Sequence, residues 1–464
     1  KDEQGRFYWA YGGDLKGYNK MNHGNFCMDG IISPDQEYLP HTHIVKKVYQ
    51  DILFEEKNLE QGIITVINDF KFTDLTNQNY TYQWKLLRNG VVFAENSFNV
   101  SLEADSKKDI TLNLPQLKRE PGVEYYLQVF AYLNEDTPVL ERGFEVAKEE
   151  FAMPFNDYFI PEERKGSLKI TKEEEKAVVQ VSDVSYEFSL KDGNTLLSMT
   201  GQGEKVFKSL PRMNFWRAPT DNDFGSEEQY NLRLWDAASY NIIWKFKNQE
   251  RNNKGVTFSY EGKLRAIDAK VLLSYTVNGD GSLGVDVKFN ALSDELPEMM
   301  RFGMLMSLPK ELSNFAWYGR GPWENYVDRK KDAFMGVWEG RVADQAFPYY
   351  RPQETGNKTD VRWVTLTDDS GKGVLVQGSQ PLSVSALNNY PEDLDPGTTK
   401  KQQHWSDVLP LDEVVLCVDL FQRGLGGLDS WRTRPFDAYR FMEKEYSYSY
   451  TISLISQEKR NKKR

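Results

Sequence analysis

Alternation of apolar and polar residues, interrupted by turn signals, is the feature of this sequence that most restricts its fold. The stretches GIITVINDFKF and YTYQWKLLRNGVVF, at 62–72 and 80–93, place apolar residues at alternate positions, which is the period of a β-strand with one buried face. Asn89-Gly90 separates two such runs, and this dipeptide favours the tight turn of a hairpin. We therefore expect an all-β chain built mainly of antiparallel strands.

Residues 51–147 carry the features of an immunoglobulin-like β-sandwich. Trp84 lies in the middle of a predicted strand, and Tyr125 follows the turn REPGVE. A buried tryptophan and a tyrosine near such a turn are typical of that fold, and about a hundred residues is its usual length. The segment 148–166 interrupts the pattern with prolines and charges, and we interpret it as a linker.

A second and larger all-β unit is predicted for residues 167–457. AKVLLSYTVNGDGSLGVDVKF indicates a hairpin around 278–281, and EVVLCVDLF and YSYSYTISLI indicate further strands. Helical periodicity is almost absent and no internal repeat divides the region, so we expect one large sandwich. The basic stretch 458–464 is interpreted as a solvated tail.

The composition excludes several classes of protein. The chain of 464 residues has a formal net charge of −11, which argues against a nucleic-acid partner. No apolar run approaches the roughly 20 residues that span a bilayer. The two cysteines, Cys27 and Cys417, provide neither a disulfide framework nor a zinc cluster. The 11 Trp and 25 Tyr suit stacking on sugars and packing in β-sheet cores equally well.

Residues 1–50 are rich in Gly, Asn and aromatic residues and resemble a long surface loop without its scaffold. A short helix is expected near HIVKKVYQDI. His41 and His43 have the spacing of a metal pair on a strand, but no third ligand is near them in the sequence, so we expect no metal there. His404, beside Trp405, is expected to be structural.

Three stretches of the larger unit contain more polar residues than a loop requires: NFWRAPTDND at 214–223, YGRGPWENYVDRK at 318–330 and RPQETGNKTDVRW at 351–363. Polar side chains beside aromatic faces suit the hydroxyl array of a sugar. The alternative, which we favour for any single charged residue here, is a salt-bridge network that holds the loops. For Glu324 and Arg329 we predict a charge-assisted hydrogen bond that fixes the loop over the sandwich.

The same three stretches resemble signature segments of the C-terminal domain of long bacterial β-galactosidases of glycoside hydrolase family 2. WAYGGDLKGYNKMNHGNFCMDGIISPD, at 9–35, resembles the segment that closes that family's catalytic barrel. GLGGLDSW, at 424–431, resembles the loop that the family's last domain sends toward the active site. The resemblance implies that residues 1–50 are the remnant of a TIM barrel, followed by the second immunoglobulin-like domain and a galactose-mutarotase-like supersandwich.

The resemblance also implies a retaining hydrolase of terminal β-D-galactosides such as lactose. Retention requires two carboxyl groups roughly 5 Å apart, and in the family both are barrel glutamates upstream of the segment present here. No glutamate of this sequence has a comparable context, so we expect no catalytic residue in the chain and no activity of the chain alone. The implied partners are the missing N-terminal domains and the galactoside, and oligomerisation is left open.

Two further parts of the family's active site are implied by the resemblance. Family members bind sodium through an upstream Asp, a Phe backbone carbonyl and an Asn side chain. The Phe corresponds to Phe26, whereas the Asn position is occupied by Asp29, which leaves the ion's presence open. Trp431 corresponds to the aromatic platform on the aglycone side. Sodium and magnesium are cofactors implied for the whole enzyme, and none is expected to bind this chain tightly.

Two other functions are weighed against this one. A free-standing carbohydrate-binding module would show glycan affinity without turnover. An aldose-epimerase-like sandwich would need an acid–base pair, here Glu324 or Glu354 acting with His404. Neither function has a use for the barrel segment at 7–40, so we favour the β-galactosidase part. The compartment, cytoplasmic or periplasmic, and the preferred aglycone are left open.

Overall fold

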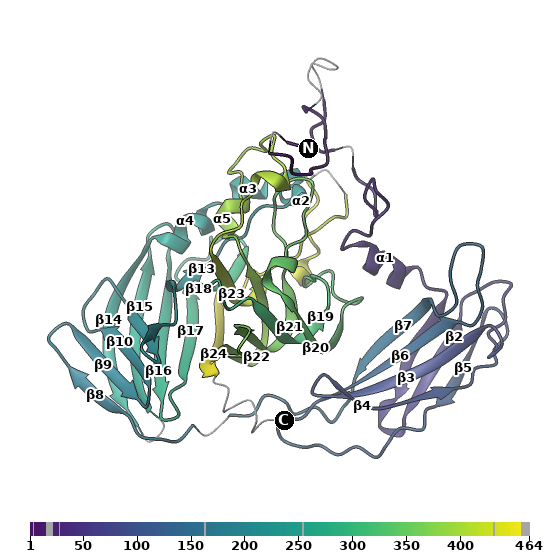
Figure 1. Ribbon diagram of the computed structural model, residues 1–464, viewed down its shortest axis with the longest axis horizontal. Coiled ribbons are helices and arrows are strands. Elements are labelled where there is room, and N and C mark those ends of the chain that lie inside the picture. Colours follow the sequence, from purple (N-terminus) through teal and green to yellow (C-terminus); the bar gives the residue numbers. More distant parts are fainter. Residues whose placement is uncertain are drawn as a thin grey trace.

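A computed structural model describes residues 1–2, 4–14, 22–26, 28–161, 164–252, 255–429 and 432–455. Two β-sandwiches lie side by side, and the N-terminal segment runs over one end of the larger sandwich (Figure 1). Strands predominate throughout the described residues, so the expected all-β class is confirmed. Within this part of the chain, no helix has the length and apolar character needed to cross a bilayer.

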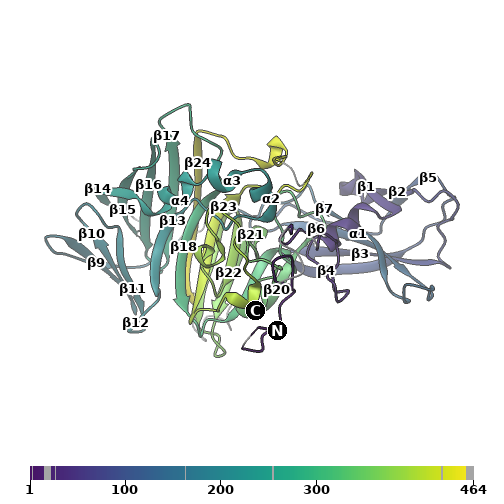
Figure 2. The ribbon, with the colours of Figure 1, turned by 90° about the horizontal axis from the view of Figure 1, so that it is seen from above.

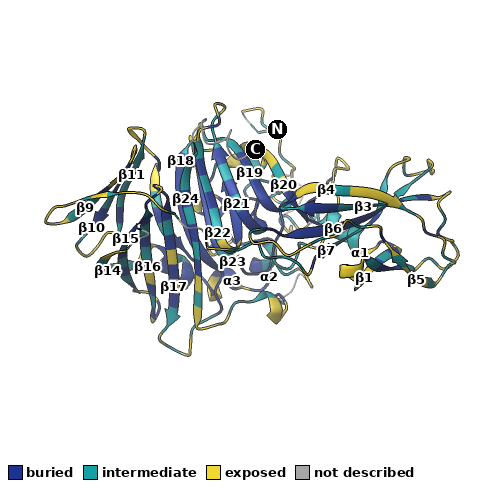
Figure 3. Cartoon of the chain, turned by 90° about the horizontal axis from the view of Figure 1, so that it is seen from below, coloured by how far each residue is buried: buried dark blue, intermediate teal, exposed yellow. Residues whose placement is uncertain are grey.

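The smaller sandwich consists of two antiparallel sheets. The three-stranded sheet has the order β1-β2-β5, with β1 (Ile52–Asn58), β2 (Ile63–Asn68) and β5 (Ser106–Thr111). The four-stranded sheet has the order β4-β3-β6-β7, with β4 (Val91–Phe98), β3 (Tyr80–Arg88), β6 (Tyr125–Leu133) and β7 (Glu145–Ala152). In Figure 3, β4 is largely exposed at the sheet edge, whereas β3 and β6 beside it are buried.

Two local expectations for this sandwich are confirmed. Trp84 lies on β3, is 2% exposed and belongs to the core between the sheets. Asn89 and Gly90 connect β3 to β4 with φ angles of 48° and 80°. Positive φ at both central positions is what a two-residue turn matched to the twist of a hairpin requires.

The larger sandwich packs a five-stranded sheet and a twelve-stranded sheet around one hydrophobic core. The five-stranded sheet has the order β12-β11-β10-β9-β8, with β8 (Lys169–Lys172), β9 (Lys176–Val181), β10 (Val184–Ser189), β11 (Leu196–Gly201) and β12 (Glu204–Lys205). The main path of the other sheet is β13-β18-β23-β22-β24-β17-β16-β15-β14, and β19, β20 and β21 extend it from β22. Its strands are β13 (Ser209–Asn214), β14 (Ile242–Arg251), β15 (Gly255–Leu264), β16 (Ala269–Asn278), β17 (Leu283–Ala291), β18 (Arg301–Pro309), β19 (Asn314–Gly321), β20 (Phe334–Arg341), β21 (Lys358–Thr367), β22 (Gly373–Leu387), β23 (Glu413–Gln422) and β24 (Glu445–Ile455).

Short helices lie at one end of the larger sandwich, beside the N-terminal segment (Figure 1). The expected helix near HIVKKVYQDI is α1 (Thr42–Val48). The helices α2 (Asp221–Gly225), α3 (Glu228–Asn231), α4 (Leu234–Tyr240) and α5 (Pro391–Leu394) were not anticipated by the sequence analysis. Single 3-10 turns occupy Leu59–Gln61, Val342–Asp344, Trp405–Asp407 and Asp437–Tyr439.

Polar contacts join the two sandwiches, which lie against each other where β6 and β7 approach β20 (Figure 2). Arg320 on β19 also contacts β7. Arg362 on β21 forms a two-pronged ion pair with Glu124, at 2.7 and 2.8 Å. Glu150 on β7 accepts hydrogen bonds from Arg320 and from the backbone N–H of Met335. These contacts fix the orientation of one sandwich on the other, because each links charged or polar groups that burial would otherwise leave unpaired.

Candidate functional site

The loop that follows β13 is built around a capped helix and a buried arginine. Thr220 accepts a hydrogen bond from the backbone N–H of Asp223, and the Asp223 carboxylate accepts one from the N–H of Thr220, which is a reciprocal cap of α2. Arg217 donates to both oxygens of Asp223, at 3.0 and 3.1 Å. It also donates to the carbonyl oxygens of Arg423 and Gly424. The loop at 214–223 is thereby tied to the start of the 424–431 loop.

The described part of the 424–431 loop is also held from a second side. The Asp328 carboxylate accepts a hydrogen bond from the N–H of Gly426 at 2.9 Å, and Asn222 donates to the carbonyl oxygen of Leu425 at 3.3 Å. The structure therefore brings together three segments that the sequence analysis singled out, from 214–223, 318–330 and 424–431.

The N-terminal segment reaches the same end of the sandwich. Asn25 donates to the Asp221 carboxylate at 2.7 Å, which also forms ion pairs with Arg351 and Lys400. Burial raises the pKa of Asp221, but the two cations outweigh this and hold the pKa below its ordinary value. Asp221 therefore remains ionised and links the N-terminal segment to two loops of the larger sandwich.

A second attachment of the N-terminal segment involves His404. Its ring nitrogen Nε2 lies 2.7 Å from the Asp14 carboxylate, and its ring contacts those of Tyr8 and Tyr11. The hydroxyl of Tyr11 donates to the carbonyl oxygen of Gln403 at 2.6 Å. A structural role for His404 was expected, but its partners, nearly 400 residues away in the sequence, were not foreseen.

The predicted pair of Glu324 and Arg329 is confirmed. Arg329 donates to Glu324 at 2.6 Å, and the carboxylate accepts further hydrogen bonds from the hydroxyls of Tyr349 and Thr355 and from the N–H of Gly356. Glu324 is 5% exposed. Burial raises its pKa, but Arg329 and the hydrogen bonds outweigh this and hold the pKa below its usual value.

A neighbouring buried cluster holds the loop at 351–363 against β18 and β23. Arg301 donates twice to Asp419, at 2.9 and 2.6 Å. Glu354 accepts a hydrogen bond from Gln422 and lies 3.9 Å from Arg301, and Asn357 accepts one from the same Gln422. Burial raises the pKa of Glu354.

These contacts decide between the two interpretations of the polar loops. The side chains of Arg217, Asp223, Glu324, Glu354 and Arg362 are buried and bonded to protein groups. They hold the loops in place and are not presented to a ligand, so for these five residues the salt-bridge interpretation is confirmed.

The predicted metal and substrate residues are placed only in part. Phe26 is 52% exposed and its N–H donates to the carbonyl oxygen of His23, and Asp29 is exposed. Among the described residues no group of three or more His, Cys, Asp or Glu is arranged to hold a metal. A Phe carbonyl and one carboxylate are two donors, fewer than the resemblance requires. Trp431 and Cys27 lie outside the described residues, as does the tail at 458–464.

His41 and His43 also have structural partners. His43 stacks on Trp323 with ring centroids 3.7 Å apart, and His41 contacts the carbonyl oxygen of Gly30 at 3.3 Å. The pair required by the epimerase alternative is not brought together: His404 bonds to Asp14, whereas Glu324 and Glu354 are held by the separate contacts described above.

Lys358 is a buried cation that the sequence analysis missed. Its ammonium donates to the carbonyl oxygen of Gly356 at 3.3 Å and lies over the ring of Trp317, and the residue is 1% exposed. Burial lowers its pKa to about 8, although Glu324 nearby acts in the opposite direction. Lys358 begins β21, in a stretch whose sequence predicts a polar loop, so the sequence gives no local signal of such burial.

We expect Lys358→Met to raise the free energy of unfolding at pH 7 by about 1–3 kcal/mol, because it removes a buried charge that forms no ion pair with a carboxylate of the described residues. The folded pKa of about 8 lies below the ordinary value of 10.5, so between these values the unfolded chain binds more protons and wild-type stability rises with pH. The gain should therefore be largest below about pH 8 and shrink toward pH 10.5. Urea denaturation at pH 7 and pH 9.5 tests this, with exposed Lys372→Met as the control. A variant less stable than wild type at pH 7 contradicts the expectation.

The fold and the loop network define an all-β protein of two sandwiches in fixed orientation. The loops of the larger sandwich and the N-terminal segment gather at one end. The family model of the β-galactosidase small chain matches residues 180–452, and the model of β-galactosidase domain 4 matches residues 64–154. The chain belongs to the β-galactosidase small-chain family.

Individual relatives agree with this assignment. A β-galactosidase of Priestia megaterium is 31% identical over 457 residues, covering 98% of this chain and 43% of that protein. A β-galactosidase of Halalkalibacterium halodurans is 30% identical over 450 residues, covering 95% and 42%. The chain thus spans less than half the length of these curated relatives. Among solved structures, a galactose mutarotase-like protein of Clostridium acetobutylicum covers 63% of this chain at 8% identity with a TM-score of 0.36, a likeness too loose to carry an argument.

Proposed function

We propose that this chain is the C-terminal part of a retaining β-galactosidase that hydrolyses terminal β-D-galactosides such as lactose. The observation that carries the proposal is that both sandwiches match β-galactosidase parts, in order, at 64–154 and 180–452. The chain supplies structural domains that hold the loops and an aromatic platform on the aglycone side, for which Trp431 is the candidate.

The loop geometry supports this role. The described residues 424–429 lead to Trp431 and are held by Arg217, Asn222 and Asp328. The segment containing Phe26 and Asp29 is attached at the same end through Asn25 and Asp221. In the proposal, the sugar would lie at this end of the larger sandwich, to which both the described part of the 424–431 loop and the N-terminal segment are attached.

The chemical step is assigned to residues outside this chain. A retaining mechanism needs an acid/base carboxyl group and a nucleophilic carboxylate about 5 Å apart, and the buried glutamates described above are committed to loop contacts. Phe26, through its carbonyl oxygen, and Asp29, through its carboxylate, would hold a cation such as sodium together with a third donor, and the ion would supply positive charge near the sugar hydroxyls.

The purified 464-residue chain should release no nitrophenol from an aryl β-galactoside above a buffer control, whereas the longer protein that contains it should hydrolyse the substrate. We expect a difference of more than about 10⁴-fold, because acid/base and nucleophilic assistance are both missing from the chain. Turnover by the chain alone contradicts the assignment of the catalytic pair. An inactive longer protein contradicts the proposed function itself.

A further inference from the structure

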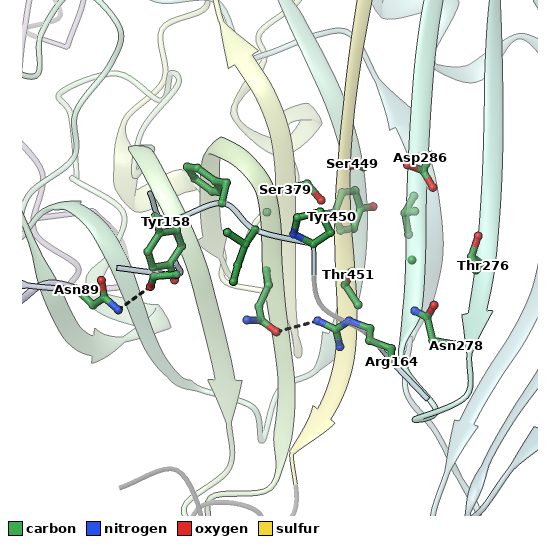
Figure 4. Close-up of a pocket in the computed structure, with 18 residues that line it drawn as sticks. Asn89, Tyr158, Arg164, Thr276, Asn278, Asp286, Ser379, Ser449, Tyr450 and Thr451 are labelled. Carbon is green, nitrogen blue, oxygen red and sulfur yellow. Dashed lines mark hydrogen bonds between the residues drawn. The ribbon is translucent and has the colours of Figure 1, made fainter. Parts of the chain in front are cut away.

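A groove crosses the outer face of the twelve-stranded sheet beside the segment 158–161 (Figure 4). It encloses about 560 Å³, within the range of about 300–1,000 Å³ usual for small-molecule sites. A second hollow of about 280 Å³ adjoins it, and both are lined by Asp286 and Ser449. The groove lies on strands β16, β17, β24 and β22 rather than among the loops described above.

Strand register places polar residues in rows across the floor of the groove. Ser274, Asp286 and Ser449 are direct neighbours on β16, β17 and β24. Neighbouring strands lie about 4.8 Å apart, so each row extends roughly 10 Å over three strands. The next row in the same direction consists of Thr276, Gly284, Thr451 and Gln377.

The central groups of these rows have hydrogen-bonding capacity left over. Ser274 and Thr276 bond to hydroxyls on β15. Within the ranges that the structure describes, the side chains of Asp286, Ser449 and Thr451 make no hydrogen bond or ion pair to protein. Asp286 faces the groove (Figure 4) and is open to solvent there. Even so, its surroundings desolvate it enough to raise the pKa of the carboxyl.

A plain solvated sheet face is the alternative explanation, and the next two rows on the side of Lys288 show what such a face looks like in this sheet. There, Lys270 pairs with Glu261 at 3.5 Å and Lys288 pairs with Glu445 at 3.6 Å. Opposite charges exposed on one face commonly pair in this way. The groove rows differ, because they present hydroxyls, the Gln377 amide and one carboxylate, Asp286, that has no ion-pair partner among the described residues.

The walls of the groove add two features that a flat sheet face lacks. The segment 158–161 lies along one side and contributes the aromatic residues Tyr158 and Phe159. Gly284 lies in the middle of a row, where a side chain would occupy the hollow. The three atoms nearest to a Cβ at Gly284 belong to Thr276 and Asn278 and lie at ordinary contact distances of 3.5–3.8 Å.

We propose that this groove binds a saccharide, a neutral ligand whose hydroxyl groups donate to Asp286 and exchange hydrogen bonds with Ser449 and Thr451. The chemistry disfavours the other ligand classes. An anion would meet the carboxylate, and the nearby Arg164 is already paired with Asp280 at 3.2 Å. A metal would have one carboxylate ligand, and an apolar ligand would leave the polar floor unpaired. Carboxylate and hydroxyl groups beside an aromatic wall match the polar edges and C–H faces of a sugar.

The test measures saccharide binding by the 464-residue chain. Lactose is the probe, maltose is a second disaccharide, and saturation-transfer NMR and calorimetry measure the binding. Saturable binding at millimolar concentrations is expected for wild type. Gly284→Val fills the hollow from a position that accepts a side chain and should weaken binding at least tenfold. Asp286→Asn keeps the shape but removes the charge and should weaken binding about three- to tenfold. Asp268→Asn, an exposed carboxylate in the β15–β16 turn outside the groove, should leave the affinity unchanged.

Circular dichroism and the thermal midpoint verify that each variant folds. If Gly284→Val does not fold, the saccharide affinity of Asp286→Asn tests the proposal. Absence of saturable binding by wild type overturns the proposal, as does a folded Gly284→Val that binds normally. Self-association that the variants abolish, without saccharide binding, would instead make a second copy of the chain the occupant. The result is separable from the proposed function, because binding by this chain requires no hydrolysis and hydrolysis by the longer protein does not depend on Gly284.

Discussion

Glu324→Ala is expected to lower the free energy of unfolding by about 3–5 kcal/mol at pH 7, the usual cost of breaking a buried ion pair. The carboxylate is 5% exposed and accepts hydrogen bonds from Arg329, Tyr349, Thr355 and Gly356. Its removal leaves the Arg329 charge and two other side-chain donors without their acceptor. The midpoint of urea denaturation, followed by tryptophan fluorescence, measures the loss.

The pH dependence of this effect has a definite sign. The folded pKa of Glu324 lies below the ordinary value of 4.5, so the stability that the carboxylate contributes is present above about pH 4.5 and is lost as the pH falls through the folded pKa. The difference between wild type and variant should therefore shrink in acid. Glu339→Ala, at an exposed position of β20, should change the midpoint by less than about 0.5 kcal/mol. Equal midpoints for Glu324→Ala and wild type at pH 7 would refute the role of the network.

Glu124→Ala should cost a similar amount, about 3–5 kcal/mol, for a different reason. Glu124 is 3% exposed and forms the two-pronged pair with Arg362 between the sandwiches. Without it, Arg362 keeps hydrogen bonds to the carbonyl oxygen of Asp360 and the hydroxyl of Tyr126 but has no counter-charge. The loss should weaken the joint between the sandwiches, so calorimetry should show the two units unfolding further apart in temperature than in wild type.

The matched control for this joint is Glu95→Ala, at an exposed position of β4 in the same sandwich. It should change neither the stability nor the separation of the two transitions. A Glu124→Ala chain with unaltered calorimetry would show that the remaining contacts, including the hydrogen bond from Gln128 to the carbonyl oxygen of Met335, suffice to hold the sandwiches together.

Features with local causes could be predicted from the sequence. The turn at Asn89-Gly90, the hairpin of β16 and β17 and the buried Trp84 each follow from a few adjacent residues. The pair of Glu324 and Arg329 was found for the same reason, since both residues belong to one turn.

Features with distant causes could not be predicted in this way. Arg217 is buried because it bonds to the backbone at 423–424, and Arg362 because it meets Glu124 in the other sandwich. No residue near either arginine in the sequence reveals these partners. The helices α2 to α4 are short enough that packing, rather than periodicity, determines them. One sequence feature indicates the polar floor of the groove. In YSYSYTISLI, Tyr448 and Tyr450 face the core, whereas Ser449 and Thr451 face outward.

The position of β24 has a consequence for how the chain acquires its structure during synthesis. The last strand lies between β17 and β22 in the interior of the twelve-stranded sheet. On the ribosome, β17 is complete at residue 291, whereas β24 begins at residue 445. At about 5–20 residues per second, the edge of β17 then waits roughly eight to thirty seconds for its neighbour. Throughout that interval the nascent sheet exposes an unpaired strand edge, which can pair with other chains until β24 occupies it.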